Sequence, residues 1–157
     1  MRAIIGIDPG TKESGWAAIK DGRLINGGIK SNHYILAMVW AIKLELEKPL
    51  PMVAIERLRG SGRAVGFETF QTVEWSGRFI EAYHVAAQDL PVLITRHEIL
   101  KALGETRGEG SADARVRRRM IELYGEPGTR SKPGPTYGLA GHAWQALAVA
   151  HVAGMKA

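Results

Sequence analysis

The feature that most constrains the fold is the opening run of apolar strands separated by turn residues. Strands are predicted at Ala3 to Asp8, at Gly15 to Ile19 and at Arg23 to Ile29. The last two are joined by the sequence KDGR, whose Asp-Gly pair is typical of a tight hairpin. Three strands in this succession predict an antiparallel meander at the start of the chain.

After the meander, helical and strand patterns alternate. The expected elements are a helix with Asn32 as N-cap and Ile35, Val39, Ile42 and Leu46 at helical spacing, a strand at Met52 to Glu56, a long helix from about Val65 to Gln88, a strand at Pro91 to Thr95, a short helix around Ile99 to Leu103, a helix opening near Ser111 and closing at Gly125, and a last helix from about Leu139. This order predicts an α/β fold, in which helices cover both faces of a mixed five-stranded sheet.

Length and composition limit the class of protein. A chain of 157 residues is expected to form one domain, residues 1–157, with a core that needs no disulfide or metal. No apolar run approaches the roughly 20 residues of a membrane span, and we expect no export signal at the start. The chain contains no cysteine, so it needs no oxidising compartment, and a cytoplasmic location is expected.

The charge balance favours a polyanionic partner such as nucleic acid. Lysine and arginine outnumber aspartate and glutamate by 21 to 16, and the sequence pI is near 9.7. Arg57, Arg59 and Arg63 lie among glycines in RLRGSGRAVG, which suits a loop that follows a phosphate backbone. Arg115 and Arg118 belong to the helical segment ARVRRRM, for which a solvated helix face is the alternative interpretation.

Two apolar strands end in a carboxylate: IIGID ends in Asp8 and MVAIE ends in Glu56. If these strands are parallel neighbours, both acids emerge at one edge of the sheet, where α/β sheets bind their ligands. Two such carboxylates repel each other and raise each other's pKa unless a divalent cation lies between them. The alternatives are a turn aspartate at Asp8, and a surface ion pair of Glu56 with Arg57 or Arg59.

The segments IIGIDPGTKESGWAAI, VAIE and HAWQALAVAHVAG resemble the RuvC family of Holliday-junction resolvases, which belongs to the ribonuclease-H-like superfamily. The segment between the last two resembles the central helix, fifth strand and following helices of that family. The resemblance therefore extends over nearly the whole chain, and its first motif is the most specific part.

The resemblance implies a ribonuclease-H-like fold and an endonuclease that cuts four-way or other branched DNA with two Mg²⁺ ions, for which Mn²⁺ can substitute. It assigns Asp8 and Glu56 as metal ligands and Lys101 as a lysine near the scissile phosphate, although an exposed helical lysine is an equal alternative. It also implies a two-fold homodimer, which matches a junction with two symmetric strands to cut. The helix from Val65 to Gln88, rich in aromatic residues, is the candidate dimer surface; the alternative is that those residues fill the core.

The last motif departs from the family pattern. The resemblance places His142 and Gln145 at the metal site, one helical turn apart on the same helix face. The family has an aspartate where this chain has Gln145, so one charge is missing, and a histidine nitrogen suits Mn²⁺ better than Mg²⁺. Gln145 is compatible with a natural divergent site, with a weakened nuclease and with a substitution that disables cutting. Asp113 and Glu74 are nearby acids that can replace the missing one, but no pattern places them at the sheet edge. For His142 the alternative is a polar residue at the start of a helix.

Two further residues are assigned to DNA. Arg59 stands near the position where the family often carries an aromatic residue that wedges into the junction, and an arginine can stack on a base or bind phosphate. Lys12, directly after the turn that follows Asp8, is expected to touch the backbone, with a solvent-exposed lysine as the alternative.

Three rival functions remain. A dimer that binds branched DNA without cutting it is the main one, because Gln145 is a poor metal ligand. The YqgF-like branch of the superfamily shares the aspartate and glycine of the first strand, but typically lacks a fourth strand ending in glutamate and a basic loop. Actin-like ATPases need a second nucleotide-binding domain, for which 157 residues leave no room.

Overall fold

The computed structural model describes residues 1–157. The elements are β1 (Ile4–Asp8), β2 (Glu13–Lys20), β3 (Arg23–Ser31), α1 (Asn32–Ala41) with a 3₁₀ turn at Ile42–Leu44, β4 (Met52–Arg57), α2 (Phe67–Ala87), β5 (Val92–Thr95), α3 (Arg96–Leu103), α4 (Ala112–Tyr124) and α5 (His142–Lys156). Together they form the α/β fold that the alternating pattern predicts.

The five strands form one mixed sheet in the order β3-β2-β1-β4-β5. The meander β1-β2-β3 is antiparallel, whereas β4 lies parallel to β1 and β5 lies parallel to β4. Consequently the carboxyl ends of β1, β4 and β5 meet at the same edge of the sheet, as expected from the two strands that end in acids.

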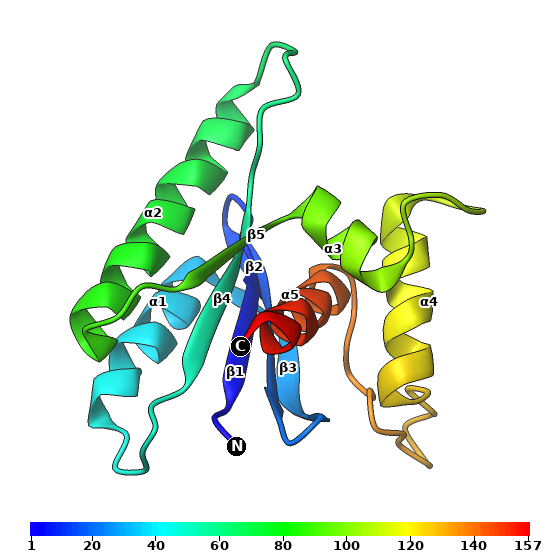
Figure 1. Ribbon diagram of the computed structural model, residues 1–157, viewed down its shortest axis with the longest axis horizontal. Helices are drawn as coiled ribbons and strands as arrows, with labels where there is room; N and C mark the ends of the chain where they lie inside the picture. Colours follow the sequence, from blue (N-terminus) through cyan, green and yellow to red (C-terminus); the bar gives the residue numbers. More distant parts are fainter.

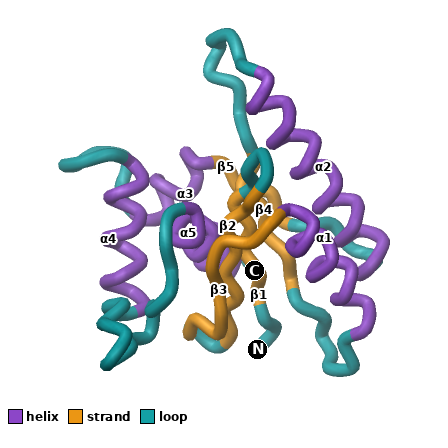
Figure 2. Tube along the Cα trace, turned by 180° about the vertical axis from the view of Figure 1, so that it is seen from behind, coloured by secondary structure: helices purple, strands orange, loops and turns teal.

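Helices cover both faces of the sheet, as Figures 1 and 2 show from opposite sides. On one face α1 and α2 pack against an apolar cluster that includes Ile7, Ile55 and Phe79. On the other face α5 lies against the sheet, with α3 and α4 packed outside it. Because α5 is enclosed on both sides, most of its residues are buried, which explains an apolar sequence all round the helix.

Glycines in the sheet let α5 approach closely. A Cβ atom on Gly6 would lie 2.1 Å from the carbonyl oxygen of Ala146, and a Cβ on Gly15 would lie 2.3 Å from that of His142. Both distances are far below van der Waals contact, so only glycine fits at these two places. The close contact fixes the first turn of α5 beside the carboxyl end of β1.

The prediction that Asn32 caps α1 is wrong. The cap is Ser31, whose hydroxyl accepts a hydrogen bond from the backbone N–H of Tyr34. Asn32 is buried, accepts a hydrogen bond from the Ser14 hydroxyl and donates one to the carbonyl oxygen of Gly10. Its side chain therefore fastens the turn that follows Asp8.

Two other boundaries differ from the sequence pattern. The helical segment ends before Leu46, which is almost fully exposed in the loop that leads to β4. The last helix begins at His142, three residues after Leu139, because Gly141 adopts φ 46°, which no helix accommodates. None of the helices is long and apolar enough to cross a membrane.

Candidate functional site

Asp8 and Glu56 lie side by side at the carboxyl edge of the sheet. The paired residues Ile7 and Ile55 face the α1–α2 layer, so the next residue on each strand faces α5. Parallel neighbours in register are about 4.8 Å apart along the sheet. The expectation that the two acid-ending strands are parallel neighbours is therefore confirmed.

Helix α5 brings His142 to Asp8. Nδ1 of His142 lies 2.7 Å from Oδ2 of Asp8, and a carboxylate can only accept, so Nδ1–H donates. The histidine side chain is otherwise 66% exposed, which leaves Nε2 directed at solvent or at a ligand. The contact depends on Gly15, because this residue pairs with Asp8 and also touches the backbone of His142.

Both carboxyl groups are buried and bind protons more tightly than usual. Burial raises the pKa of Asp8, although the hydrogen bond from His142 opposes the rise. Burial and the Asp8 charge raise the pKa of Glu56 to about 7, against the attraction of Arg96. Oε2 of Glu56 is buried without any hydrogen-bond partner. Such an orphaned oxygen is costly unless a cation or a proton satisfies it.

Arg96 is the cation that the structure does place in the site. It follows β5 and opens α3, which begins with a capping box formed by Thr95 and Glu98. Ile94 pairs with Glu56 and belongs to the α5 side of the sheet, so Arg96, two residues later, starts from the same side. Its Nε lies 3.1 Å from Oε1 of Glu56, and its Nη1 lies 2.9 Å from Oδ1 of Asp113.

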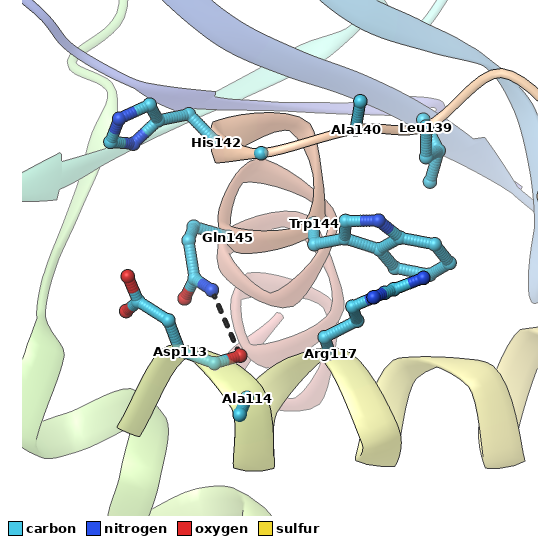
Figure 3. A pocket seen from close by; sticks show the side chains of 9 residues that line it. Asp113, Ala114, Arg117, Leu139, Ala140, His142, Trp144 and Gln145 are labelled. Atoms are coloured by element: carbon cyan, nitrogen blue, oxygen red, sulfur yellow. Dashed lines mark hydrogen bonds between the residues drawn. The ribbon is translucent and has the colours of Figure 1, made fainter. Parts of the chain in front are cut away.

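Gln145 completes this cluster from α5. Its amide oxygen accepts a hydrogen bond from Nη1 of Arg96, and its amide nitrogen donates to the backbone carbonyl of Asp113 over 3.4 Å. Figure 3 shows Gln145 directed from α5 toward Asp113 on α4, at a pocket of about 410 Å³. The residue is only 3% exposed, and both ends of the amide are hydrogen-bonded, so the cluster suits an amide at position 145.

The residues fit a divalent cation between Asp8 and Glu56, but they do not fit a second one on the far side of Glu56. The free Oε2 of Glu56 beside Asp8 offers carboxylate oxygens, which are the ligands that Mg²⁺ and Mn²⁺ accept. No group of three or more His, Asp or Glu side chains converges on a common point. On the other side of Glu56, the oxygens of Gln145 and Asp113 already surround the Arg96 guanidinium.

The other predicted residues lie around this edge without contacting the two acids. Lys101 is exposed on α3, and five residues after Arg96 it points about 140° away from it around the helix. Lys12 is exposed in the turn after β1. No hydrogen bond or ion pair joins either lysine to Asp8 or Glu56, and their roles stay predictions.

The five predicted DNA-binding arginines fall into two groups. Arg57 is the exposed last residue of β4, and Arg59 and Arg63 are exposed in the loop between β4 and α2; this loop projects past the sheet at the top of Figure 1. Arg115 instead donates to the carbonyls of Glu105 and Gly110, and Arg118 donates to the carbonyl of Glu109. These two side chains brace the loop before α4, although Arg118 remains exposed.

Sequence reasoning missed Arg96 and left Asp113 unplaced. Counting alternate residues along β5 from Ile94 would have put Arg96 on the side of Glu56, but only if the pairing of β4 with β5 were known. Asp113 reaches the site because α4 packs on α5, a contact that no motif encodes. Glu74, the other acid considered, lies on α2 beside Trp40 and Arg78, in the layer on the opposite face.

The likeness of this chain to known proteins lies in its structure. No family model matches the chain, and no curated protein matches it. Among solved structures, Thermus thermophilus RuvC in complex with a Holliday-junction substrate superposes with a TM-score of 0.68 at 18% identity, over 97% of this chain and 92% of that chain. A second T. thermophilus RuvC structure gives a TM-score of 0.64 at 20% identity, over 98% of this chain and 96% of that chain. The chain therefore has a RuvC-like, ribonuclease-H-like fold, as its motifs predict.

Proposed function

We propose that the protein is a structure-specific endonuclease that hydrolyses phosphodiester bonds in four-way or other branched DNA. The observation that carries this proposal is the pair of buried carboxylates at the ends of β1 and β4, with one glutamate oxygen left without a partner. The RuvC-like fold supports the same function, since one structural neighbour is a RuvC bound to a Holliday-junction substrate.

In this proposal Asp8 and Glu56 hold a divalent cation between them. A cation there would polarise the phosphodiester and acidify an attacking water. His142 fixes the orientation of the Asp8 carboxylate through Nδ1 and keeps Nε2 free at the mouth of the site. Mg²⁺ and Mn²⁺ are both compatible with these ligands, and Nε2 favours Mn²⁺.

The path of the DNA follows the exposed basic loop after β4. Arg57, Arg59 and Arg96 line a cavity of about 490 Å³ that also borders Glu56, so positive charge surrounds the approach to the carboxylates. Phosphates that enter this cavity would meet arginines on one side and Glu56 on the other. In this proposal Arg59 and Arg63 hold the backbone beyond the cut, and Lys12 holds it near Asp8; the exposure of all three side chains supports these roles.

We also propose a two-fold homodimer formed through the first turns of α2. Phe79 and Tyr83 are fully buried in this chain's own core, but Phe67, Phe70 and Val73 are at least half exposed. These three residues follow one another at intervals of three, so they share a helix face. A dimer through this face would cover apolar surface that one chain leaves in water, and would present two sites to a symmetric junction.

The experiment is incubation of an end-labelled four-way junction with Mg²⁺ or Mn²⁺, followed by denaturing electrophoresis. Symmetric nicks in opposing strands support the nuclease. Two controls test structure specificity: a single strand and a linear duplex, each of the same sequence as a junction arm. Cleavage of all three substrates at equal rates would contradict specificity for branches, and no cleavage with either metal would contradict the nuclease.

One observation favours a second function, a protein that binds branched DNA without cutting it. Gln145 carries no charge, and Arg96 neutralises part of the acidic site. A retarded but uncut junction on a native gel would support this alternative. Recovery of cutting by Gln145→Asp would then show that the deficit is one charge.

A further inference from the structure

Three oxygen atoms from three separate elements accept from the Arg96 guanidinium. They are Oε1 of Glu56 from β4, Oδ1 of Asp113 from α4 and the amide oxygen of Gln145 from α5. A set of two carboxylates and one amide oxygen is typical of a hard divalent cation. In this protein the position is filled by a guanidinium that belongs to the chain itself.

The two oxygens of the Glu56 carboxylate have different surroundings. Glu56 uses Oε1 for Arg96 and leaves Oε2 buried and unpartnered. The same carboxylate therefore faces a permanent positive charge with one oxygen and can face Asp8 and an added cation with the other. Arg96 is about one third exposed, on the side of the cavity lined by Arg57 and Arg59.

We propose that Arg96 acts as a built-in cation in place of a second metal ion, so that the site takes one divalent ion per chain. This inference rests on the proposed nuclease function and concerns how the site supplies its positive charge. A guanidinium keeps its charge at any working pH and donates in a planar fork. It can therefore contact a phosphate oxygen from the exposed cavity while it remains paired with Glu56.

The amide at position 145 suits both the arginine and the backbone beside it. An amide accepts from the guanidinium with its oxygen and donates to the Asp113 carbonyl with its nitrogen. A carboxylate there would meet that carbonyl with no proton to donate, and would leave an unfavourable contact between two oxygens. Gln145 and Arg96 thus match each other in hydrogen bonding, because each polar end of the amide has a partner in the cluster.

The test counts ions by isothermal titration calorimetry with Mn²⁺ on the metal-free full chain, alongside the junction-cleavage assay. Wild type is expected to bind one Mn²⁺ per chain. The exchange variant Arg96→Gln with Gln145→Asp is expected to bind two, because it removes the guanidinium and adds a carboxylate. Arg23→Gln is the matched control, since it removes an exposed arginine at the opposite end of the sheet, and is expected to bind one.

Cleavage rates of single variants distinguish a role of the Arg96 charge from a purely structural role of its side chain. Arg96→Gln is expected to lower the cleavage rate by about 10²- to 10³-fold, as for loss of one donor to developing charge. Arg96→Lys, which keeps the charge, is expected to recover at least tenfold of that loss. Thermal melting of each variant, without metal, establishes that it is folded before its ions are counted.

Each outcome decides between the two proposals. One ion in wild type and two in the exchange variant support the built-in cation. Two ions in wild type with cutting intact, or Arg96→Gln cutting within twofold of wild type, overturn the role of Arg96 and leave the nuclease in place. An exchange variant that is folded and binds only one ion also overturns it. No bound ion and no cutting in wild type overturn both proposals.

Discussion

Replacement of Gly15 by alanine tests how the backbone of β2 positions the site. The added Cβ would lie 2.3 Å from both the carbonyl carbon and oxygen of His142, and 2.7 Å from the nitrogen of Ala143, whereas ordinary contact begins at 3.4 Å. The first turn of α5 must therefore move outward by about 1 Å, because a close-packed interior has no room to absorb the methyl group. A shift of that size separates Nδ1 of His142 from Oδ2 of Asp8, which are 2.7 Å apart.

Overpacking of this kind costs about 1–3 kcal/mol, and each kcal/mol lowers Tm by about 2–4 °C in a domain of this size. Urea denaturation measures the loss of unfolding free energy, and the junction assay measures the loss of cutting. The matched control is Gly77→Ala on α2, where a Cβ meets nothing within 4 Å. Replacement of an exposed helical glycine by alanine should raise the free energy of unfolding by about 0.5–1 kcal/mol. If Gly15→Ala is as stable and as active as wild type, the close approach of α5 to the sheet does not position His142.

Three further predictions follow from the same geometry. In metal-free protein, the rise in the Glu56 pKa from 4.5 to about 7 means that the folded state binds this proton more tightly, so the contribution of Glu56 to stability is fully present below pH 4.5 and falls by about 3 kcal/mol as the pH rises to 7. Glu56→Gln should remove most of this loss, which is measured by denaturation curves recorded at pH 5 and pH 8 with a chelator. If the variant loses as much unfolding free energy as wild type between these pH values, Glu56 is not the group responsible. Asp8→Asn should abolish cleavage while junction binding stays equal or tightens, because it removes negative charge facing the phosphates; cutting at the wild-type rate refutes the site. Arg59→Ala should weaken junction binding and lower the slope of log affinity against log salt by about one, whereas Arg23→Ala, exposed at the opposite end of the sheet, should not.

The strands and the edge where they end could be predicted from sequence, because a strand that is buried on both faces appears as a continuous run of apolar residues. β1 and β4 are apolar on both faces and each stops at a carboxylate, so their pairing followed from a single assumption about neighbours. The end of α1 and the start of α5 were less accurate. Asn32 is a good N-cap residue by type, but a buried hydrogen bond to Ser14, distant in sequence, determines its role instead.

Within the site, the two acids and the two α5 residues carried motif signals, and the arginine did not. Arg96 belongs to none of the motifs found in the sequence. Its role depends on the register of β4 with β5 and on the packing of α4 against α5. Gln145 therefore looked like a missing charge when considered alone. Beside Arg96 and the Asp113 carbonyl it is a matched hydrogen-bonding partner.

The proposed nuclease depends on one divalent cation that Asp8 and Glu56 share at the carboxyl edge of the sheet. The most direct measurement is anomalous diffraction from a crystal of the protein soaked in Mn²⁺. We expect one anomalous peak per chain, in contact with both carboxylates, while the Arg96 guanidinium keeps its contact with Glu56. An ion-free site at saturating Mn²⁺, or carboxyl groups too far apart to touch the same ion, would contradict it.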